Sequence, residues 1–336
     1  MSSVEEVLAQ LSPKLRKSLF AGDSVPEVQF LRSPSPALQK ALGGGHALGR
    51  QTLIWGNKSA GKSSYCLQMV ALAQQDGKVC AWIDSEMSFD KSWAERLGVD
   101  TSKLIVSQAR SINEMVDIGV QLMAAGVDLI VIDSISALLP AIYFEKDSEN
   151  LKQLEDTKQI GAESRDFSGA WKMLNYANNK VKPTALVAIS QSRTNIGYIS
   201  TQIPQGGNAT KFYSSTIIKL FSSESESQAI KGDLVVGDKV LQKVIGRKVN
   251  WEVQFNKTGP AFQSGSYNFY FRGDNIGVDT VFDLVEIAEA EGIVVRGGAW
   301  YSFGEEQHQG KDKLVKAIRE NPELVKQLME KVNETV

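Results

Sequence analysis

Residues 56–63 read Gly56-Asn57-Lys58-Ser59-Ala60-Gly61-Lys62-Ser63, which fits the pattern GxxxxGK[ST] at every fixed position. The two glycines let the chain curl, so that successive backbone N–H groups point at an anion from the start of a helix. Lys62 adds a cation for the β- and γ-phosphates, and the Ser63 hydroxyl is suited to hold Mg²⁺. A strand-like run at 51–55 precedes the loop, and helical spacing from 64 to 74 follows it. The sequence therefore predicts a nucleoside triphosphate site.

The segment around this loop alternates between buried strands and helices from about 53 to 254. This alternation predicts an α/β domain with a mostly parallel sheet covered by helices on both faces. The predicted strands are 79–83, 104–106, 129–132 and 185–189, and the predicted helices are 62–76, 92–97, 112–125 and 167–181. Ligands of such sheets bind at the carboxyl ends of the strands, where this chain places polar residues.

The two ends of the chain differ from this core. Residues 3–19 have an amphipathic pattern interrupted at Pro13, which predicts a helical arm that either folds back on its own core or docks on a neighbour. After about 217, strand-like segments that include 243–255 and 267–271 predict antiparallel additions to the sheet. From about 277 the pattern is that of a small helical unit, with helices at 281–290 and 311–332 and a break at Asn321-Pro322.

Composition and net charge limit the classes of function that this chain can have. In 336 residues the formal net charge is −2, so a binding site for nucleic acid has to come from local loops or from charge repeated in an assembly. Cys66 and Cys80 fall in apolar runs without metal-site spacing, which favours buried thiols in a reducing compartment. No apolar run reaches about 18 residues and the N-terminus lacks a signal-peptide pattern, so we expect a cytoplasmic protein without a membrane partner.

Three of the polar residues that follow predicted strands are candidates for contacts with a bound nucleotide. Asp133 ends an apolar run and would hold Mg²⁺ opposite Ser63, although an isolated Asp there is more often a cap or turn residue. Glu86 could orient the water that attacks the γ-phosphate, or it could be an ordinary surface carboxylate. Gln191 could report the γ-phosphate through its amide, but a glutamine at a strand end is weakly diagnostic by itself.

A stretch between Ser192 and Lys211 has no clear periodicity. Long irregular loops inside compact domains are usually functional or disordered, and γ-phosphate at Gln191 could order this one. Arg165 and Lys172 are seven residues apart, so they share a helix face if the helix predicted at 167–181 begins earlier. Charges on such a face are ordinarily only solvated.

Several segments together resemble the bacterial RecA recombinase family over nearly the whole chain, and a phage-encoded homologue is one form that this resemblance allows. The matching segments are 56–64, 81–86, 97–100, 130–134, 206–213 (Gly-Gly-Asn-Ala-Thr-Lys-Phe-Tyr) and 298–302 (Gly-Ala-Trp-Tyr-Ser). The resemblance implies a RecA-type P-loop ATPase core at 29–275, an N-terminal helical arm for subunit docking at 1–28 and a small C-terminal α/β module at 276–336.

The resemblance also implies roles for single residues. It gives Glu86, Lys62, Gln191 and Lys257 to catalysis, with Gln191 as the switch that couples ATP to DNA. Nucleotide binding falls to residues 56–64, to Asp133 and to Asp90 and Trp93, which would contact adenine. Ser63 and Asp133 would hold Mg²⁺, the latter through water. Two DNA-binding loops at about 155–165 and 194–210 would supply, with the adjoining helix, Arg165, Lys172, Arg193, Ile199, Gly206, Gly207 and Asn208.

By this resemblance the protein is a DNA-dependent ATPase whose cofactors are ATP and Mg²⁺. It would form a homo-oligomeric helical filament on single-stranded DNA and exchange strands with homologous double-stranded DNA, with Phe212 at the subunit interface. One departure is the segment Phe255-Asn256-Lys257, where the family usually has two lysines that reach the neighbouring subunit's phosphates. The loss of one lysine and a second DNA-binding loop that aligns as shorter than the family's keep open a second function, an ATP-switched filament scaffold with weak hydrolysis. A helicase-type motor is a third alternative, which Gly207-Asn208-Ala209 and the C-terminal module disfavour, because both resemble the recombinase pattern.

Overall fold

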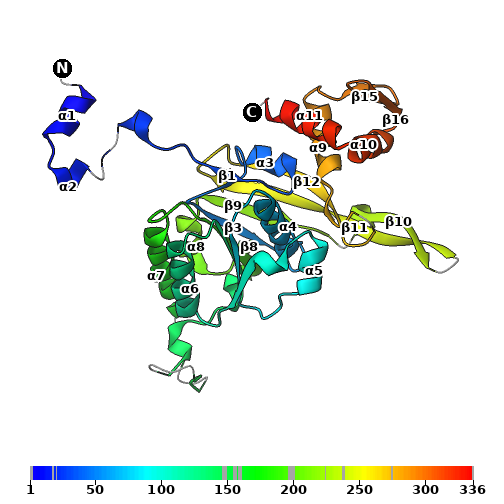
Figure 1. Ribbon diagram of the computed structural model, residues 1–336. Helices are drawn as coiled ribbons and strands as arrows, with labels where there is room; N and C mark the ends of the chain where they lie inside the picture. The colour runs from blue at the N-terminus through cyan, green and yellow to red at the C-terminus, as the bar shows by residue number, and fades with distance from the viewer. Residues whose placement is uncertain are drawn as a thin grey trace.

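The computed structural model describes residues 3–16, 19, 21–145, 150–153, 157, 161–195, 201–223, 225–236, 239–273 and 275–334. Its centre is a parallel sheet in the order β9-β3-β7-β6-β4-β5, as the α/β pattern predicts (Figure 1). These strands are β3 (Gln51–Gly56), β4 (Cys80–Asp84), β5 (Leu104–Gln108), β6 (Leu129–Asp133), β7 (Ala185–Asn195) and β9 (Thr216–Phe221).

Helices cover both faces of this sheet. The covering helices are α4 (Lys62–Gln75) and α5 (Lys91–Arg96) on one face and α6 (Ile112–Ala124), α7 (Ala162–Ala177) and α8 (Gly207–Tyr213) on the other (Figure 1). Alternate strand residues face opposite layers, so Ile54 packs with the α4 layer and Leu53 with the layer of α6 and α7. Apolar residues at consecutive positions of β3 are therefore all buried.

Antiparallel strands extend the sheet beyond β9, as predicted. They are β10 (Ala229–Val236), β11 (Lys239–Asn256), β12 (Gln263–Tyr270) and β13 (Gly277–Val278). The β10–β11 hairpin projects from the body of the molecule (Figure 1).

The N-terminal arm extends away from the body and is broken at Pro13 as predicted (Figure 1). Its helices are α1 (Val4–Gln10) and α2 (Pro13–Arg16), and neither contains a buried residue. Val4 is 63% exposed, so this apolar stripe does not fold back on its own core. The arm leads to β1 (Phe30–Leu31), α3 (Pro36–Ala41) and β2 (His46–Ala47).

The C-terminal module has its own hydrophobic core and contains strands that the helical pattern did not predict. Its elements are α9 (Thr280–Ala290), β14 (Val295–Gly297), β15 (Trp300–Phe303), β16 (Glu306–Gln309), α10 (Lys311–Glu320) and α11 (Pro322–Asn333). The three strands form a separate antiparallel sheet. They are two short hairpins without a long apolar run, which explains why periodicity did not reveal them.

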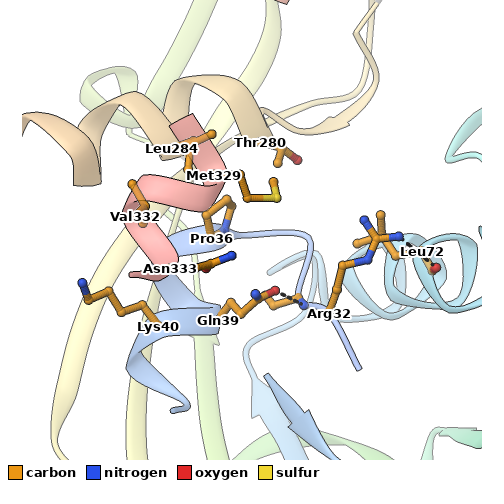
Figure 2. Close-up of a pocket in the computed structure, with 11 residues that line it drawn as sticks. Arg32, Pro36, Gln39, Lys40, Leu72, Thr280, Leu284, Met329, Val332 and Asn333 are labelled. Atoms are coloured by element: carbon orange, nitrogen blue, oxygen red, sulfur yellow. Dashed lines mark hydrogen bonds between the residues drawn. The ribbon is translucent and has the colours of Figure 1, made fainter. Parts of the chain in front are cut away.

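The module packs on the core through α3. The Asp283 carboxylate of α9 accepts hydrogen bonds from Ser35 Oγ at 2.6 Å and from Ala37 N at 3.1 Å. Beside this contact, α3, α4, α9 and α11 enclose a pocket of about 40 Å³, with Leu284 and Met329 among its lining residues (Figure 2). This volume is close to that of one or two water molecules, so the pocket is far too small for a nucleotide.

The described residues include no helix with the length and apolar character needed to cross a membrane. Cys66 and Cys80 are both buried and free, which agrees with the prediction of unpaired thiols.

Candidate nucleotide-binding and DNA-binding site

The loop at 56–63 joins the end of β3 to the start of α4, as its pattern requires. Gly56 has φ of +157°, and a Cβ there would lie 1.8 Å from the Leu220 carbonyl oxygen of β9. Gly61 has φ of +83° and is the N-cap of α4. Only glycine fits at position 56, because β9 passes directly beside it.

Lys62 is folded over this loop. Its Nζ donates hydrogen bonds to the Gly56 carbonyl at 3.2 Å and to the Asn57 carbonyl at 2.8 Å. Burial lowers the pKa of Lys62, while the nearby carboxylates of Asp133 and Glu86 oppose that shift. The ammonium group is thus held at the mouth of the loop, where phosphates would bind.

Asp133 ends β6 beside the loop. Burial raises the pKa of the Asp133 carboxyl to about 6, and a hydrogen bond with the Ser63 side chain opposes the shift. A hydroxyl and a carboxylate are oxygen ligands of the kind that Mg²⁺ prefers, and Mg²⁺ takes its other ligands from water and phosphate. Accordingly, the part of the chain that the structure describes has no cluster of three or more metal-binding side chains.

Glu86 and Gln191 are in direct contact, although 105 positions separate them in sequence. The Gln191 side-chain amide donates to Glu86 Oε1 at 2.9 Å. The Ser134 hydroxyl donates to the same oxygen at 2.5 Å. The structure therefore brings together the candidates for the water-orienting residue and for the γ-phosphate reporter, next to the phosphate-binding loop.

The main chain of Gln191 is tied to its surroundings by two further hydrogen bonds. Its N–H donates to Ser136 Oγ at 2.9 Å, and its carbonyl accepts from Gln205 N at 3.1 Å. Beyond this point β7 pairs with β8 (Thr201–Pro204) in antiparallel register. The residue that touches Glu86 thus also forms the base of the β7–β8 hairpin.

The candidate adenine contacts lie on α5. Asp90 is the N-cap of this helix, and its carboxylate accepts from Trp93 N at 3.1 Å. The Trp93 indole N–H donates to Ser64 Oγ at 3.1 Å, which ties α5 to the end of the phosphate-binding loop. The Arg96 guanidinium lies 5.1 Å from the Trp93 ring centroid and covers part of that ring.

Arg165 and Lys172 are both exposed on α7, which begins five residues earlier than the predicted helix and ends at Ala177. Of the predicted first loop at 155–165, positions 162–165 therefore belong to a helix. Arg193 is exposed and lines a polar pocket of about 400 Å³ with residues of the α7 N-terminus. Ile199 lies outside the described residues.

The second predicted loop, 194–210, contains more regular structure than its lack of periodicity indicated. It includes β8 and the start of α8, which is capped by Gly206 with φ of +89°. A Cβ on Gly207 would lie 2.8 Å from Ser164 Oγ, and Trp171 Nε1 donates to Thr210 Oγ1 at 2.9 Å. Helices α7 and α8 are therefore packed together, and Asn208 is exposed on the latter.

Lys257 does not meet the phosphate-binding loop of its own subunit. It follows Asn256, which pairs with Thr216 at the start of β9, whereas Gly56 pairs with Leu220 near the other end of that strand. Lys257 is exposed, and its Nζ lies 5.8 Å from the Phe255 ring centroid. Any contact of Lys257 with a nucleotide would have to involve a second copy of the chain.

Ser134 and Ser136 carry no sequence signal that predicts a role for them. Both follow Asp133 closely, and serine after a strand-terminal aspartate carries no distinctive signal. Their partners, Glu86 and Gln191, come from strands whose spatial order the sequence alone does not give.

Comparison with known proteins supports one family. The RecA N-terminal domain family matches residues 5–272, and the RecA C-terminal domain family matches residues 282–336. The chain is 36% identical to Protein RecA of Thermus aquaticus over 314 residues, which cover 92% of this chain and 86% of that protein. It is 33% identical to Protein RecA of Colwellia psychrerythraea over 341 residues, which cover 99% of this chain and 92% of that protein. The chain therefore belongs to the RecA family of DNA-dependent ATPases that act in recombination and repair.

Proposed function

We propose that this protein forms a helical filament on single-stranded DNA when ATP is bound, and then pairs that strand with homologous duplex DNA. The observation that carries the proposal is the contact between Glu86 and Gln191 at 2.9 Å. Gln191 is also the first residue of the β7–β8 hairpin base, which leads to Arg193 and to the turn at Gly206. A nucleotide that competes for the Gln191 amide would therefore act directly on the DNA-binding segment.

In this proposal the backbone N–H groups of residues 56–64 and the Lys62 ammonium bind the phosphates. Asp90 and Trp93 bind the adenine, and the indole ring supplies a stacking surface. Ser63 and Asp133 hold Mg²⁺, which neutralises charge on the phosphates. Glu86 orients the attacking water, because its Oε1 is already fixed by Ser134 and Gln191.

The proposed division of the chain is an arm at 1–28, a core at 29–275 and a C-terminal module at 276–336. The arm supports assembly because its apolar residues are exposed, with Val4 at 63% and Leu15 at 52%. Phe212 on α8 is 80% exposed and would lie at the same interface. Lys257 would reach the nucleotide of the neighbouring subunit.

DNA would be gripped through its phosphates by Arg165, Lys172 and Arg193, with Ile199, Gly206, Gly207 and Asn208 as further contacts. A chain with a net charge of −2 has no overall excess of positive charge. Repetition of these cations along a filament builds the positive field that one subunit lacks, and binding would therefore weaken steeply with salt.

The test is steady-state ATP hydrolysis with and without single-stranded DNA, with Lys62→Ala as the background. We expect strong stimulation by DNA in the wild type and none in the variant, followed by strand exchange in a homology-dependent assay. Hydrolysis that does not respond to DNA in a protein that binds DNA would overturn the DNA-coupled ATPase.

One observation favours a second function. Phe255 stands where the family usually has a lysine, and its ring lies beside the remaining Lys257. One cation fewer on the transition state slows phosphoryl transfer. A filament that switches with ATP but hydrolyses it slowly would then serve as a platform for other proteins, and ATP-dependent DNA binding without strand exchange would identify it.

A further inference from the structure

The Gln191 main chain lies just beyond the point where β6 stops supporting β7. The paired residues of these two strands run from Leu129 with Ala185 to Ile132 with Ala188. After Asp133 the chain leaves the sheet and forms a short 3₁₀ helix, Ile135–Ala137. The last residue of β7 that pairs with β6 is Ala188, three residues before Gln191. Strand β6 therefore offers Gln191 no partner.

Ser136 supplies that missing partner. Its Oγ accepts the hydrogen bond of the Gln191 N–H at 2.9 Å, in partly buried surroundings. The N–H and C=O of one strand residue point to the same side, and here the carbonyl accepts from Gln205 N at 3.1 Å. Gln191 is thus fixed through its main chain, while only its side chain reaches Glu86.

The side chain of Gln191 can therefore move independently of its main chain. The side-chain amide can leave Glu86 by rotation about its own bonds, while the main chain stays tied to both the post-β6 turn and the hairpin. Without the Ser136 hydrogen bond, the end of β7 is less constrained. A rotation of the Gln191 side-chain amide is then accompanied by a small shift of the strand itself. Positional errors of about 1 Å are enough to impair such a contact.

We infer that Ser136 is a positioning residue for Gln191, and that its hydroxyl oxygen is required to couple nucleotide binding to DNA affinity. The inference rests on the proposed function, since it presupposes that Gln191 responds to the nucleotide. It does not involve contact between Ser136 and either ligand.

The experiment compares Ser136→Thr with Ser136→Val, because the two side chains have nearly the same shape and only threonine retains the hydroxyl. The affinity for a fluorescent single-stranded oligonucleotide is measured at fixed salt, with and without a non-hydrolysable ATP analogue. The ratio of the two affinities is the coupling. Gln191→Ala serves as the uncoupled reference.

We expect Ser136→Val to reduce the coupling by about fivefold to tenfold, the effect of one lost hydrogen bond. Ser136→Thr should keep the coupling near the wild-type value. Both variants should bind the analogue within about twofold of wild type in the absence of DNA, because neither change touches the phosphate-binding loop. Hydrogen exchange at the Gln191 amide should be faster in the valine variant only.

Failure of the proposed function and failure of the role of Ser136 give different results in this experiment. A wild-type protein whose DNA affinity ignores the analogue would overturn the proposed function itself. A coupled wild type, together with valine and threonine variants that couple equally, would overturn the role of Ser136. Equal loss of analogue binding in both variants would also overturn it, because the residue would then serve only the general fold of the site.

Discussion

Two glycines of the phosphate-binding loop allow a matched test at the scale of single residues. A Cβ at Gly56 would lie 1.8 Å from the Leu220 carbonyl, whereas a Cβ at Gly61 would have no neighbour within 4 Å. Gly61→Ala should cost only the strain of a left-handed residue, about 1–2 kcal/mol. Gly56→Ala has to displace β9 and should cost roughly 3 kcal/mol or more.

The measurement is the free energy of unfolding in urea, together with binding of a fluorescent ATP analogue. Gly56→Ala should lose analogue binding even at temperatures where it remains folded. Equal stability of the two variants would show that β9 does not confine the loop.

Glu86 gives a second prediction at this scale. Its carboxylate is held through one oxygen by Ser134 and Gln191. Glu86→Gln keeps the shape but cannot accept a proton, so the DNA-stimulated kcat should fall by about 10²–10⁴-fold while analogue binding is retained. Glu330→Gln, which changes an exposed carboxylate on α11, is the control and should leave kcat unchanged. Retention of kcat in Glu86→Gln would assign the water to another residue.

At the scale of elements, the strands and helices that the sequence predicts well are those with a strong hydrophobic pattern. Strands β3, β4, β6 and β7 are apolar runs between turns, and each appears within one or two residues of its predicted start. The start of α7 was wrong by five residues, because its first turn, Ala-Glu-Ser-Arg, has little apolar signal. The short strands β8 and β14–β16 are stabilised by pairing partners, which a one-dimensional pattern does not contain.

The same limit applies to the site. Residues 56–63 are contiguous, so their chemistry was readable from the sequence alone. The contact of Glu86 with Gln191 depends on the order β3-β7-β6-β4, in which β6 separates the strands that carry the two residues. The contact of these two residues across β6 could not be predicted without the three-dimensional arrangement. The same holds for the hydrogen bonds that Ser134 and Ser136 make with them.

The contact of α9 with α3 predicts a pH dependence of stability. Burial raises the pKa of Asp283 to about 6 from the ordinary 3.8, although hydrogen bonds from Ser35 and Ala37 oppose the shift. Because the folded-state pKa is raised, the stabilising contribution is fully present below pH 3.8 and is lost as the pH rises through about 6. Between pH 5 and 7 the wild type should lose roughly 1 kcal/mol from this group.

Asp283→Asn should remove that component, because the amide has the same shape and does not titrate. The free energy of unfolding in urea is measured at pH 5, 6 and 7 for both proteins, and the difference between them cancels the contribution of the other groups. A constant difference across this range would contradict the assignment to Asp283.

At the scale of the whole molecule, the proposed function makes one subunit an incomplete enzyme. The phosphate-binding loop lies at the carboxyl ends of the parallel strands, and Lys257 lies beside the start of β9, at the opposite end. The arm that carries α1 and α2 extends from the body with its apolar residues exposed (Figure 1). A head-to-tail assembly would place the Lys257 of one copy against the loop of the next. Such a contact gives a ring if its rotation closes and an open helical filament if it does not.

This arrangement predicts complementation between two inactive proteins. Lys62→Ala subunits lack a working loop but retain Lys257, and Lys257→Ala subunits have the reverse defect. Each alone should show little DNA-stimulated hydrolysis. In a randomly assembled equimolar mixture, about a quarter of the interfaces join an intact loop to an intact Lys257, so the rate should recover to about a quarter of wild type.

The control is the double variant Lys62→Ala/Lys257→Ala, which should restore nothing when mixed with Lys62→Ala, because no interface then has an intact loop. Deletion of residues 1–28 from both complementing proteins should abolish the recovery, since the proposed function assigns subunit docking to the arm. Normal hydrolysis by Lys257→Ala alone would show that this lysine has no part in the reaction. An inactive mixture of two proteins that still assemble would show that Lys257 does not act across the subunit interface.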